Sequence, residues 1–230
     1  MKTTGNTVFI SGGSAGIGLA IAKKLSAAGN RIIINGRNEE RLQNALKELD
    51  NAIAIQGDLS VEADRVRIAT QLKELYPDVN IIVNNAGAAF SYLLNETENA
   101  HEKAAVEMNT NYFSVIHFTE LLLPHLAQKT EAAVVNISSI SVFGSHKLLP
   151  TYGATKAALH SYTVALRYTL EEEKNVQIYE VYPPLVDTQF SAEIGGANGI
   201  PPSEVADELF IALENNQFDV PVGDTKNYFK

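Results

Sequence analysis

A phenol and an amine stand four residues apart in the stretch TYGATKAAL, where Tyr152 is followed by Lys156. Hydride transfer to a carbonyl leaves an alkoxide and the reverse reaction starts from an alcohol, so the reacting oxygen needs a proton donor and acceptor. A phenol with an ordinary pKa of about 10 is a poor base at neutral pH, and a nearby positive charge lowers that pKa. Because positions i and i+4 share one helix face, the spacing favours Tyr152 as a general acid/base tuned by Lys156. The alternative for the tyrosine alone is a half-buried aromatic.

Glycines are concentrated in ISGGSAGIGLAIA, between a short apolar run and a helical pattern. There they let the backbone turn tightly and let a pyrophosphate approach the main chain, while the N–H groups of the helix start face the anion. Two other motifs overlap this stretch. A P-loop is excluded because Leu19 and Ala20 stand where Lys and Ser/Thr are required. A hydrolase nucleophile elbow at Ser14 is disfavoured, because that elbow follows several strands and only one precedes it here.

The second apolar run ends in Asn35-Gly36-Arg37, with no carboxylate. In dinucleotide folds an acidic residue at this point holds the adenosine ribose hydroxyls, whereas an arginine suits a 2′-phosphate. A guanidinium binds phosphate through paired hydrogen bonds, so Arg37 favours NADP(H), with NAD(H) as the alternative. A second alternative is that Arg37 is simply a solvated charge at the start of a helix.

Short β-branched runs alternate along the chain with longer segments of helical apolar spacing. The predicted strands are 7–11, 31–35, 52–56, 80–85, 132–138, 176–182 and a short 220–223. The predicted helices are 16–29, 38–49, 61–75, 97–109, 111–128, 152–174 and 202–215. Strands that are apolar on both faces are typical of a sheet buried between two helical layers. The pattern predicts an α/β fold, a Rossmann-type doubly wound parallel sheet of six to seven strands, in one domain over 1–230 with a substrate loop at about 188–200.

Composition narrows the classes of ligand. The 230 residues are 45% hydrophobic and 20% charged, and 18 Lys+Arg against 27 Asp+Glu give a net charge of −9. An acidic chain is a poor general binder of nucleic acid or of anionic membranes, so a small-molecule ligand is expected. The lack of cysteine, of a signal-like N-terminal run and of a long apolar stretch favours a cytoplasmic protein. No metal site is expected, because His101-Glu102 begins an H-E-x-x-H motif that fails at Ala105.

Together these residues resemble the short-chain dehydrogenase/reductase family over about residues 5–190. The family's T-G-x-x-x-G-x-G appears as Ser11 to Gly18, with serine for the leading threonine. The other matching motifs are Asp58 in GDLS, NNAG at 84–87, Asn111 in TNYFS, Ser139 in NISS and Y-x-x-x-K at 152–156. Each motif is weak alone, and their joint order along the chain carries the resemblance.

The resemblance implies an NAD(P)-dependent oxidoreductase that interconverts a ketone or aldehyde with an alcohol. The catalytic residues that it implies are Asn111, Ser139, Tyr152 and Lys156. Ser139 would bond the substrate oxygen, and Asn111 would hold a water that links Lys156 to solvent. The implied cofactor-binding residues are Gly12, Ser14, Gly16, Ile17, Gly18, Arg37, Asp58, Leu59, Asn85, Gly87, Tyr152, Lys156, Pro183, Val186 and Thr188. The expected substrate pocket consists of Ser139, Phe143, Leu148, Leu185 and Phe190.

Two departures from the family pattern stand out. Pro184 occupies the position of a usual glycine, so the loop over the nicotinamide is expected to follow a different path. Only seven residues follow Gly223, and the usual glycine-rich ending is absent. A homodimer or homotetramer through the helices 111–128 and 152–174 is still implied. Two other functions stay open: a nucleotide-sensing binding protein of the same fold, and a related enzyme that acts on a sugar or an acyl thioester.

Overall fold

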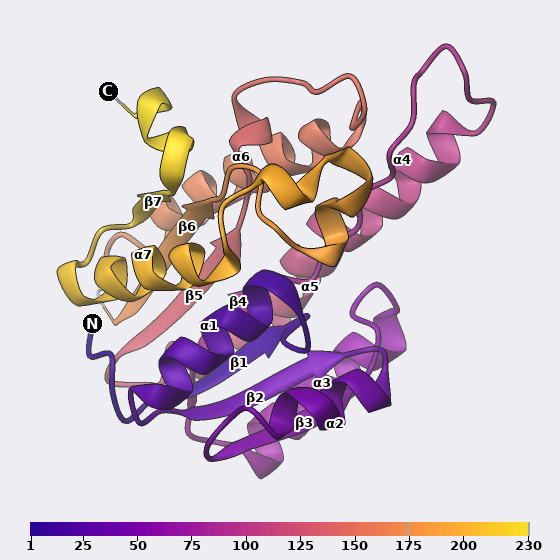
Figure 1. The fold of residues 1–230 in the computed structure, drawn as a ribbon. Helices are drawn as coiled ribbons and strands as arrows, with labels where there is room; N and C mark the ends of the chain where they lie inside the picture. The colour runs from indigo at the N-terminus through magenta and orange to yellow at the C-terminus, as the bar shows by residue number, and fades with distance from the viewer. Residues whose placement is uncertain (174, 230) are drawn as a thin grey trace.

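The computed structural model describes residues 1–173 and 175–229. Among them, seven parallel strands form one sheet in the order β3-β2-β1-β4-β5-β6-β7 (Figure 1). The strands are β1 (Thr7–Ser11), β2 (Arg31–Gly36), β3 (Ala52–Gln56), β4 (Val79–Asn84), β5 (Ala132–Ile137), β6 (Val176–Tyr182) and β7 (Asp219–Pro221). The strand order reverses between β1 and β4, which is the switch point where such sheets bind ligands. The predicted doubly wound sheet is confirmed.

Helices cover both faces of this sheet. One face carries α1 (Gly16–Ala27), α2 (Glu39–Leu46) and α7 (Pro202–Asn215), and α1 packs against α7 (Figure 1). The other face carries α3 (Glu62–Leu75), α5 (Ser114–Leu126) and α6 (Tyr152–Thr169). Two apolar clusters fill the spaces between sheet and helices, which explains why the strands are apolar on both faces. The helix predicted to reach 174 ends at Thr169, and residue 174 lies outside the described residues.

The helices predicted at 97–109 and 111–128 are joined rather than separate. α4 (Ala100–Met108) continues through a π turn, Asn109–Phe113, into α5. A π turn carries an extra residue and is frequent at functional sites. Here it directs the buried Asn111 towards the loop after β4. Sequence periodicity shows a break at this point because the extra residue shifts the apolar phase.

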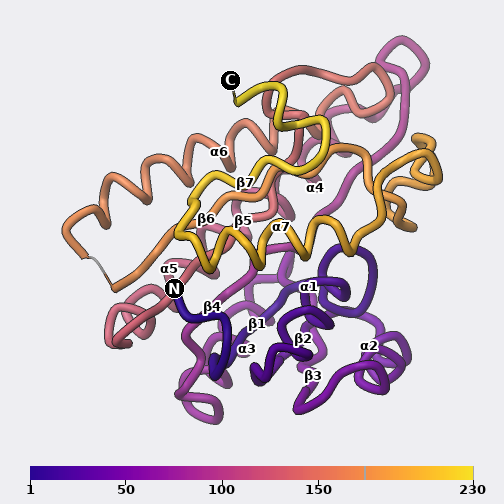
Figure 2. Tube along the Cα trace, turned by 60° about the vertical axis from the view of Figure 1, so that its left-hand side comes forward, coloured from indigo at the N-terminus to yellow at the C-terminus, as the bar shows by residue number. Residues whose placement is uncertain are grey.

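The segments after β6 contain more regular structure than the sequence suggests. Residues Gln189–Ile194 and Gly196–Asn198 form short 3₁₀ helices, and a bridge joins Val186 to Ile200. A last 3₁₀ segment, Gly223–Tyr228, brings the C-terminal end of the chain beside the loop that follows β5 (Figures 1 and 2). Both segments lie at the carboxyl ends of the strands, where the predicted site residues are found.

Candidate active site

The first turn of α6 places the phenol and the amine in one buried row. Tyr152, Thr155 and Lys156 are all buried at the start of this helix. The Lys156 Nζ atom lies 5.6 Å from the centroid of the Tyr152 ring, over its face. The predicted i, i+4 pair therefore exists, and it lies at the carboxyl end of the sheet.

The protonation of Tyr152 differs from the sequence expectation. Burial raises the pKa of the phenol, the hydrogen bond with Ser139 lowers it, and the negative charge of Glu107 raises it again. The balance is a pKa above the ordinary value, whereas the sequence predicted that Lys156 lowers it. Burial, the largest of these effects, sets the direction of the pKa shift of Tyr152. At neutral pH Tyr152 is the protonated phenol, the form that donates a proton.

Lys156 is held against the end of β5. Its Nζ donates a hydrogen bond to the backbone carbonyl of Ile137 at 2.7 Å. Burial lowers the pKa of this amine to about 8, and the negative charge of Glu180 acts in the opposite direction. Lys156 therefore changes charge close to physiological pH, unlike an exposed lysine.

Ser139 lies directly after β5, at the N-cap of a short 3₁₀ turn, Ile140–Val142. Its hydroxyl accepts a hydrogen bond from the Ser141 backbone N–H at 3.1 Å and is a hydrogen-bonding neighbour of Tyr152. Its neighbour Ser138 is buried and its Oγ has no partner among the described residues. The structure thus puts Ser139, rather than Ser138, beside the phenol.

Asn111 joins the loop after β4 to α6. Its Oδ1 accepts from the Ala88 N–H at 2.8 Å, and its Nδ2 donates to the Ala88 carbonyl at 2.8 Å and to the Thr155 hydroxyl at 2.9 Å. Thr155 in turn donates to the carbonyl of Tyr152. Both N–H groups of the amide are therefore engaged within the protein. The side chain acts as a clamp between the two segments.

The glycine turn between β1 and α1 has no room for side chains. A Cβ on Gly18 would lie 2.4 Å from the Gly12 carbonyl oxygen, and one on Gly12 would lie 2.9 Å from the Asn85 Nδ2. Gly12 and Gly16 have φ of 63° and 53°, the left-handed region that favours glycine. α1 has neither a side-chain N-cap nor an acidic residue in its first turn. Its first N–H groups are therefore ready to face an anion.

Two predicted cofactor residues, Asn85 and Thr188, contact this turn, and a third, Gly87, lies beside Asn111. Asn85 donates through Nδ2 to the carbonyls of Ser11 and Gly12 at 2.9 and 3.2 Å. Thr188 lies against Gly16 from the loop after β6, since a Cβ on that glycine would be 3.1 Å from the Thr188 Cγ2. A Cβ on Gly87 would be 3.3 Å from the Asn111 Oδ1.

A hollow of about 360 Å³ adjoins the ends of β2 and β3. It is lined by Arg37, Gln56, Gly57, Asp58, Asp64 and Arg67. The Arg37 guanidinium is largely exposed and lies 3.7 Å from the Asp58 carboxylate. Leu59 and Ile17, which the sequence also assigns to the cofactor, pack into the two apolar clusters through their side chains.

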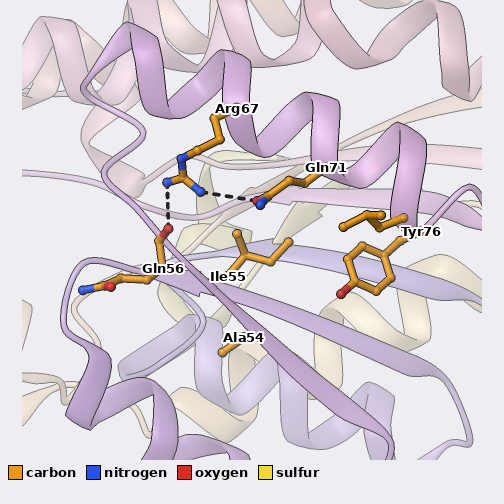
Figure 3. A pocket seen from close by; sticks show the side chains of 7 residues that line it. Ala54, Ile55, Gln56, Arg67, Gln71 and Tyr76 are labelled. Atoms are coloured by element: carbon orange, nitrogen blue, oxygen red, sulfur yellow. Dashed lines mark hydrogen bonds between the residues drawn. The ribbon is translucent and has the colours of Figure 1, made fainter.

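A larger hollow, of about 430 Å³, is lined by residues of β3 and α3 and by Tyr76 (Figure 3). Within it, Arg67 donates to the Gln56 carbonyl at 2.9 Å and to the Gln71 Oε1 at 3.3 Å. Its lining contains none of the predicted catalytic residues. The volume of a hollow therefore does not indicate the candidate active site. The polar groups that converge at Tyr152 indicate it.

Two of the predicted pocket residues, Phe143 and Phe190, have aromatic neighbours. The Phe190 ring lies 6.1 Å from the Tyr152 ring, in the first 3₁₀ turn after β6. Phe143 contacts the C-terminal segment, where its ring stacks on Tyr228 at 5.0 Å and meets Phe229 edge-on at 5.4 Å. The loop path near Pro184 is fixed by a hydrogen bond from the Ile140 N–H to the Pro183 carbonyl.

Comparisons with known proteins agree with this geometry. Residues 6–198 match the family model described as short chain dehydrogenase. The chain belongs to the short-chain dehydrogenase/reductase family. It is therefore an oxidoreductase of that family, and the resemblance drawn from its motifs is confirmed.

Individual members of the family are similar over most of their length. The protein named uncharacterized oxidoreductase DltE of Bacillus subtilis is 36% identical over 92% of this chain and 83% of its own length. A fatty acyl-CoA reductase of Acinetobacter baylyi is 30% identical over 91% of this chain and 73% of its own length.

Solved structures of the family share the fold. A short-chain dehydrogenase/reductase from Burkholderia phymatum in complex with NAD has a TM-score of 0.89 at 21% identity, covering 96% of this chain and 90% of that one. A short chain dehydrogenase from Burkholderia cenocepacia in complex with NADP has a TM-score of 0.87 at 23% identity, covering 100% and 92%.

Two buried carboxylates near the family's active-site residues were missed by the sequence analysis. Glu107, in α4, accepts from the Phe90 N–H at 2.9 Å and from the Thr151 hydroxyl at 2.6 Å. Glu180 lies within β6 and is fully buried. Glu180 carried a usable signal, because a charged residue inside VQIYEVY interrupts a strand that is otherwise apolar. Glu107 carried none, because a glutamate is ordinary in an amphipathic helix.

The described residues contain no group of three or more His, Cys, Asp or Glu side chains placed to hold a metal ion. None of their helices has the length and apolar character needed to cross a bilayer.

Proposed function

We propose that this member of the family interconverts a ketone or aldehyde with an alcohol and uses NADP(H) in preference to NAD(H). The observation that supports it most is the meeting of Tyr152, Lys156 and Ser139 with the glycine turn at one end of the sheet. A proton donor, an amine and an anion cradle in one place are the parts that a nicotinamide-dependent carbonyl reaction needs. We infer that the whole chain, 1–230, works as one domain.

The residues present fit a nicotinamide dinucleotide. The uncapped start of α1 and the absent side chains at Gly12 and Gly18 leave the backbone open to a pyrophosphate. The residues that would hold the cofactor are those named from the sequence, and Thr188 is the one that reaches Gly16 from outside the turn. When bound, the nicotinamide supplies or accepts the hydride.

The chain's own residues handle the proton. In carbonyl reduction the protonated Tyr152 donates its phenolic proton to the reacting oxygen, and in alcohol oxidation it takes that proton back. Ser139, beside the phenol, holds the same oxygen by a hydrogen bond. Lys156 supplies positive charge near the phenolate that forms. Asn111 keeps Thr155, and with it the first turn of α6, in place through its hydrogen bonds.

Arg37 supports the cofactor preference. β2 ends without a carboxylate, and the guanidinium beside the 360 Å³ hollow is exposed and free to pair with a 2′-phosphate in place of Asp58. Of the family structures above, one contains NAD and the other NADP, so the fold accommodates both.

Separate titrations with NADPH and NADH, followed by a panel of carbonyl and alcohol substrates, test this function. We expect NADPH to bind more tightly, and we expect Arg37→Asp to lose that advantage. Arg41→Asp is the matched control, since Arg41 is also an exposed arginine at the start of α2. Tighter binding of NADH by the unchanged protein contradicts the cofactor assignment, and absence of turnover in both directions contradicts the reaction.

An acyl thioester substrate is the second candidate. It is favoured by the fatty acyl-CoA reductase that is 30% identical to this chain, and by the apolar Phe190 over Tyr152. Reduction of a medium-chain acyl thioester in the same panel, without reduction of simple ketones, would favour it over the first candidate.

We further propose self-association as a homodimer or homotetramer through the region of α5 and α6. Phe113, at the entrance to α5, and Tyr168, near the end of α6, expose large apolar surfaces. Exposed aromatic side chains are common in protein interfaces.

A further inference from the structure

Glu180 is a charged residue in the interior of the sheet. It lies in β6, paired in register with Asn136 of β5 on one side and with Asp219 of β7 on the other. Its side chain is fully buried. A buried carboxylate is costly unless hydrogen bonds or an opposite charge compensate it. The groups around Glu180 therefore have to compensate its buried carboxylate.

Only one of the two carboxylate oxygens of Glu180 is used for hydrogen bonding. Oε2 accepts from the Tyr182 hydroxyl at 2.9 Å and lies 3.0 Å from the Nδ1 of His160. Oε1 is buried and has no hydrogen-bond partner in residues 1–173 and 175–229. Hydrogen bonds therefore compensate the burial of Oε2 but not that of Oε1.

Among the residues that the structure describes, the buried ammonium of Lys156 likewise lacks an ion-pair partner. Lys156 stands four residues before His160 on α6, so the two side chains share one helix face, and His160 contacts Glu180 on β6. Its ammonium donates to the Ile137 carbonyl but, within the described part of the chain, makes no ion pair at 4.0 Å or less. Lys156 thus lacks a direct counter-charge among the described residues, and Glu180 has only His160 beside its Oε2, a contact that is an ion pair only when the imidazole is protonated.

We propose that Glu180, in β6, is a positioning residue that acts through Lys156. Its buried carboxylate favours the ammonium form of the lysine. The catalytic meaning of this coupling depends on the proposed function, whereas the coupling itself does not. The direction is consistent, because burial lowers the pKa of Lys156 to about 8 and the charge of Glu180 raises it. Without Glu180 the amine would lose its proton at a lower pH.

The other charged groups that face Glu180 do not replace it. His160 on α6 and Tyr182 on β6 contact its Oε2. Asp219 on β7 shares the Tyr182 hydroxyl but is paired with Arg167 of α6 at 2.8 Å and has a side chain that is 45% exposed. Solvent and the arginine therefore screen Asp219, while Glu180 is shielded from water.

Two substitutions separate this role from a structural one. Glu180→Gln removes the charge but keeps an acceptor for the Tyr182 hydroxyl in a side chain of the same size. Asp219→Asn removes the same charge from the other partner of that hydroxyl. A purely structural role predicts similar behaviour for the two variants, and the proposed coupling predicts different behaviour.

The test is an NMR titration of the Lys156 side chain in labelled protein, with its resonance assigned by loss in Lys156→Arg. We expect the titration midpoint to fall by about one unit, tenfold in proton affinity, in Glu180→Gln and to be unchanged in Asp219→Asn. Equal midpoints in the unchanged protein and Glu180→Gln overturn the proposal. If the midpoint shifts in Glu180→Gln but the unchanged protein turns over no carbonyl or alcohol, the coupling stands and the proposed function fails.

The unchanged protein offers a second measurement, which decides the matter if Glu180→Gln does not fold. The coupling requires Glu180 to be ionised at neutral pH, so its side-chain carboxyl carbon must resonate at the ionised position. A carboxyl carbon at the protonated position at pH 7 contradicts the proposal.

Discussion

At the scale of single residues, the account depends on two buried side chains whose protonation is set by their surroundings. Tyr152 keeps its proton because burial and Glu107 raise its pKa, and Lys156 loses its proton early because burial lowers its pKa to about 8. The positive charge of Lys156 is therefore present below about pH 8 and lost above it. Tyr152 is a proton donor throughout this range, and the charge beside it is what changes.

This protonation predicts the pH dependence of carbonyl reduction. We expect kcat/KM to fall as pH rises through about 8, because the neutral amine no longer stabilises the phenolate that forms. Lys156→Arg keeps its positive charge at all accessible pH values, so we expect its alkaline decline to disappear. We also expect its maximal rate to be lower than that of the unchanged protein, because arginine and lysine are not interchangeable in shape. Steady-state rates of both proteins across pH 6–10 would check this, and the same decline in Lys156→Arg would show that another group causes it.

At the scale of elements, short segments position these side chains. The π turn at Asn109–Phe113 directs Asn111 into its clamp, and the glycine turn brings α1 against the loop after β4. The sequence predicted the turn because glycines and their spacing are visible locally. It could not predict the π turn or the clamp, because hydrogen bonds from Asn111 to Ala88 and Thr155 depend on packing between distant segments.

The glycine turn gives a prediction with a matched control. Gly18→Ala places a Cβ 2.4 Å from the Gly12 carbonyl oxygen, so the backbone must move and the cradle must open. We expect a loss of about 1–3 kcal/mol in the free energy of unfolding and weaker cofactor binding. Gly144→Ala meets nothing within 4 Å and should change neither. Denaturant unfolding and cofactor titration of both variants measure this, and equal results would show that the turn tolerates a side chain.

At the scale of the whole molecule, the sheet and its two helical layers follow the sequence closely. The seven strands of the described residues begin and end within about two residues of the predicted bounds, because β-branched runs buried on both faces are a strong signal. The C-terminal segment is different. Its stacking of Tyr228 and Phe229 on Phe143 joins residues far apart in sequence, and no local pattern indicates it.

Self-association is the prediction that belongs to this scale. We expect sedimentation to give a dimer or tetramer, and we expect Phe113→Glu or Tyr168→Glu to shift the mass towards the monomer, since both place a charge on an exposed apolar surface of the proposed interface. Ile211→Glu on α7 is the control, because Ile211 is similarly exposed outside that region. A monomeric unchanged protein, or equal dissociation by the control, contradicts the proposed interface.

In the proposed reaction the Tyr152 hydroxyl transfers the proton, while the glycine turn holds the cofactor. The direct measurement is single-turnover carbonyl reduction by Tyr152→Phe, with cofactor affinity determined on the same sample. The phenylalanine keeps the contact with Phe190, so we expect a folded protein with ordinary cofactor affinity and a loss of at least about a hundredfold in rate. Turnover by Tyr152→Phe at a rate comparable with the unchanged protein would contradict the account.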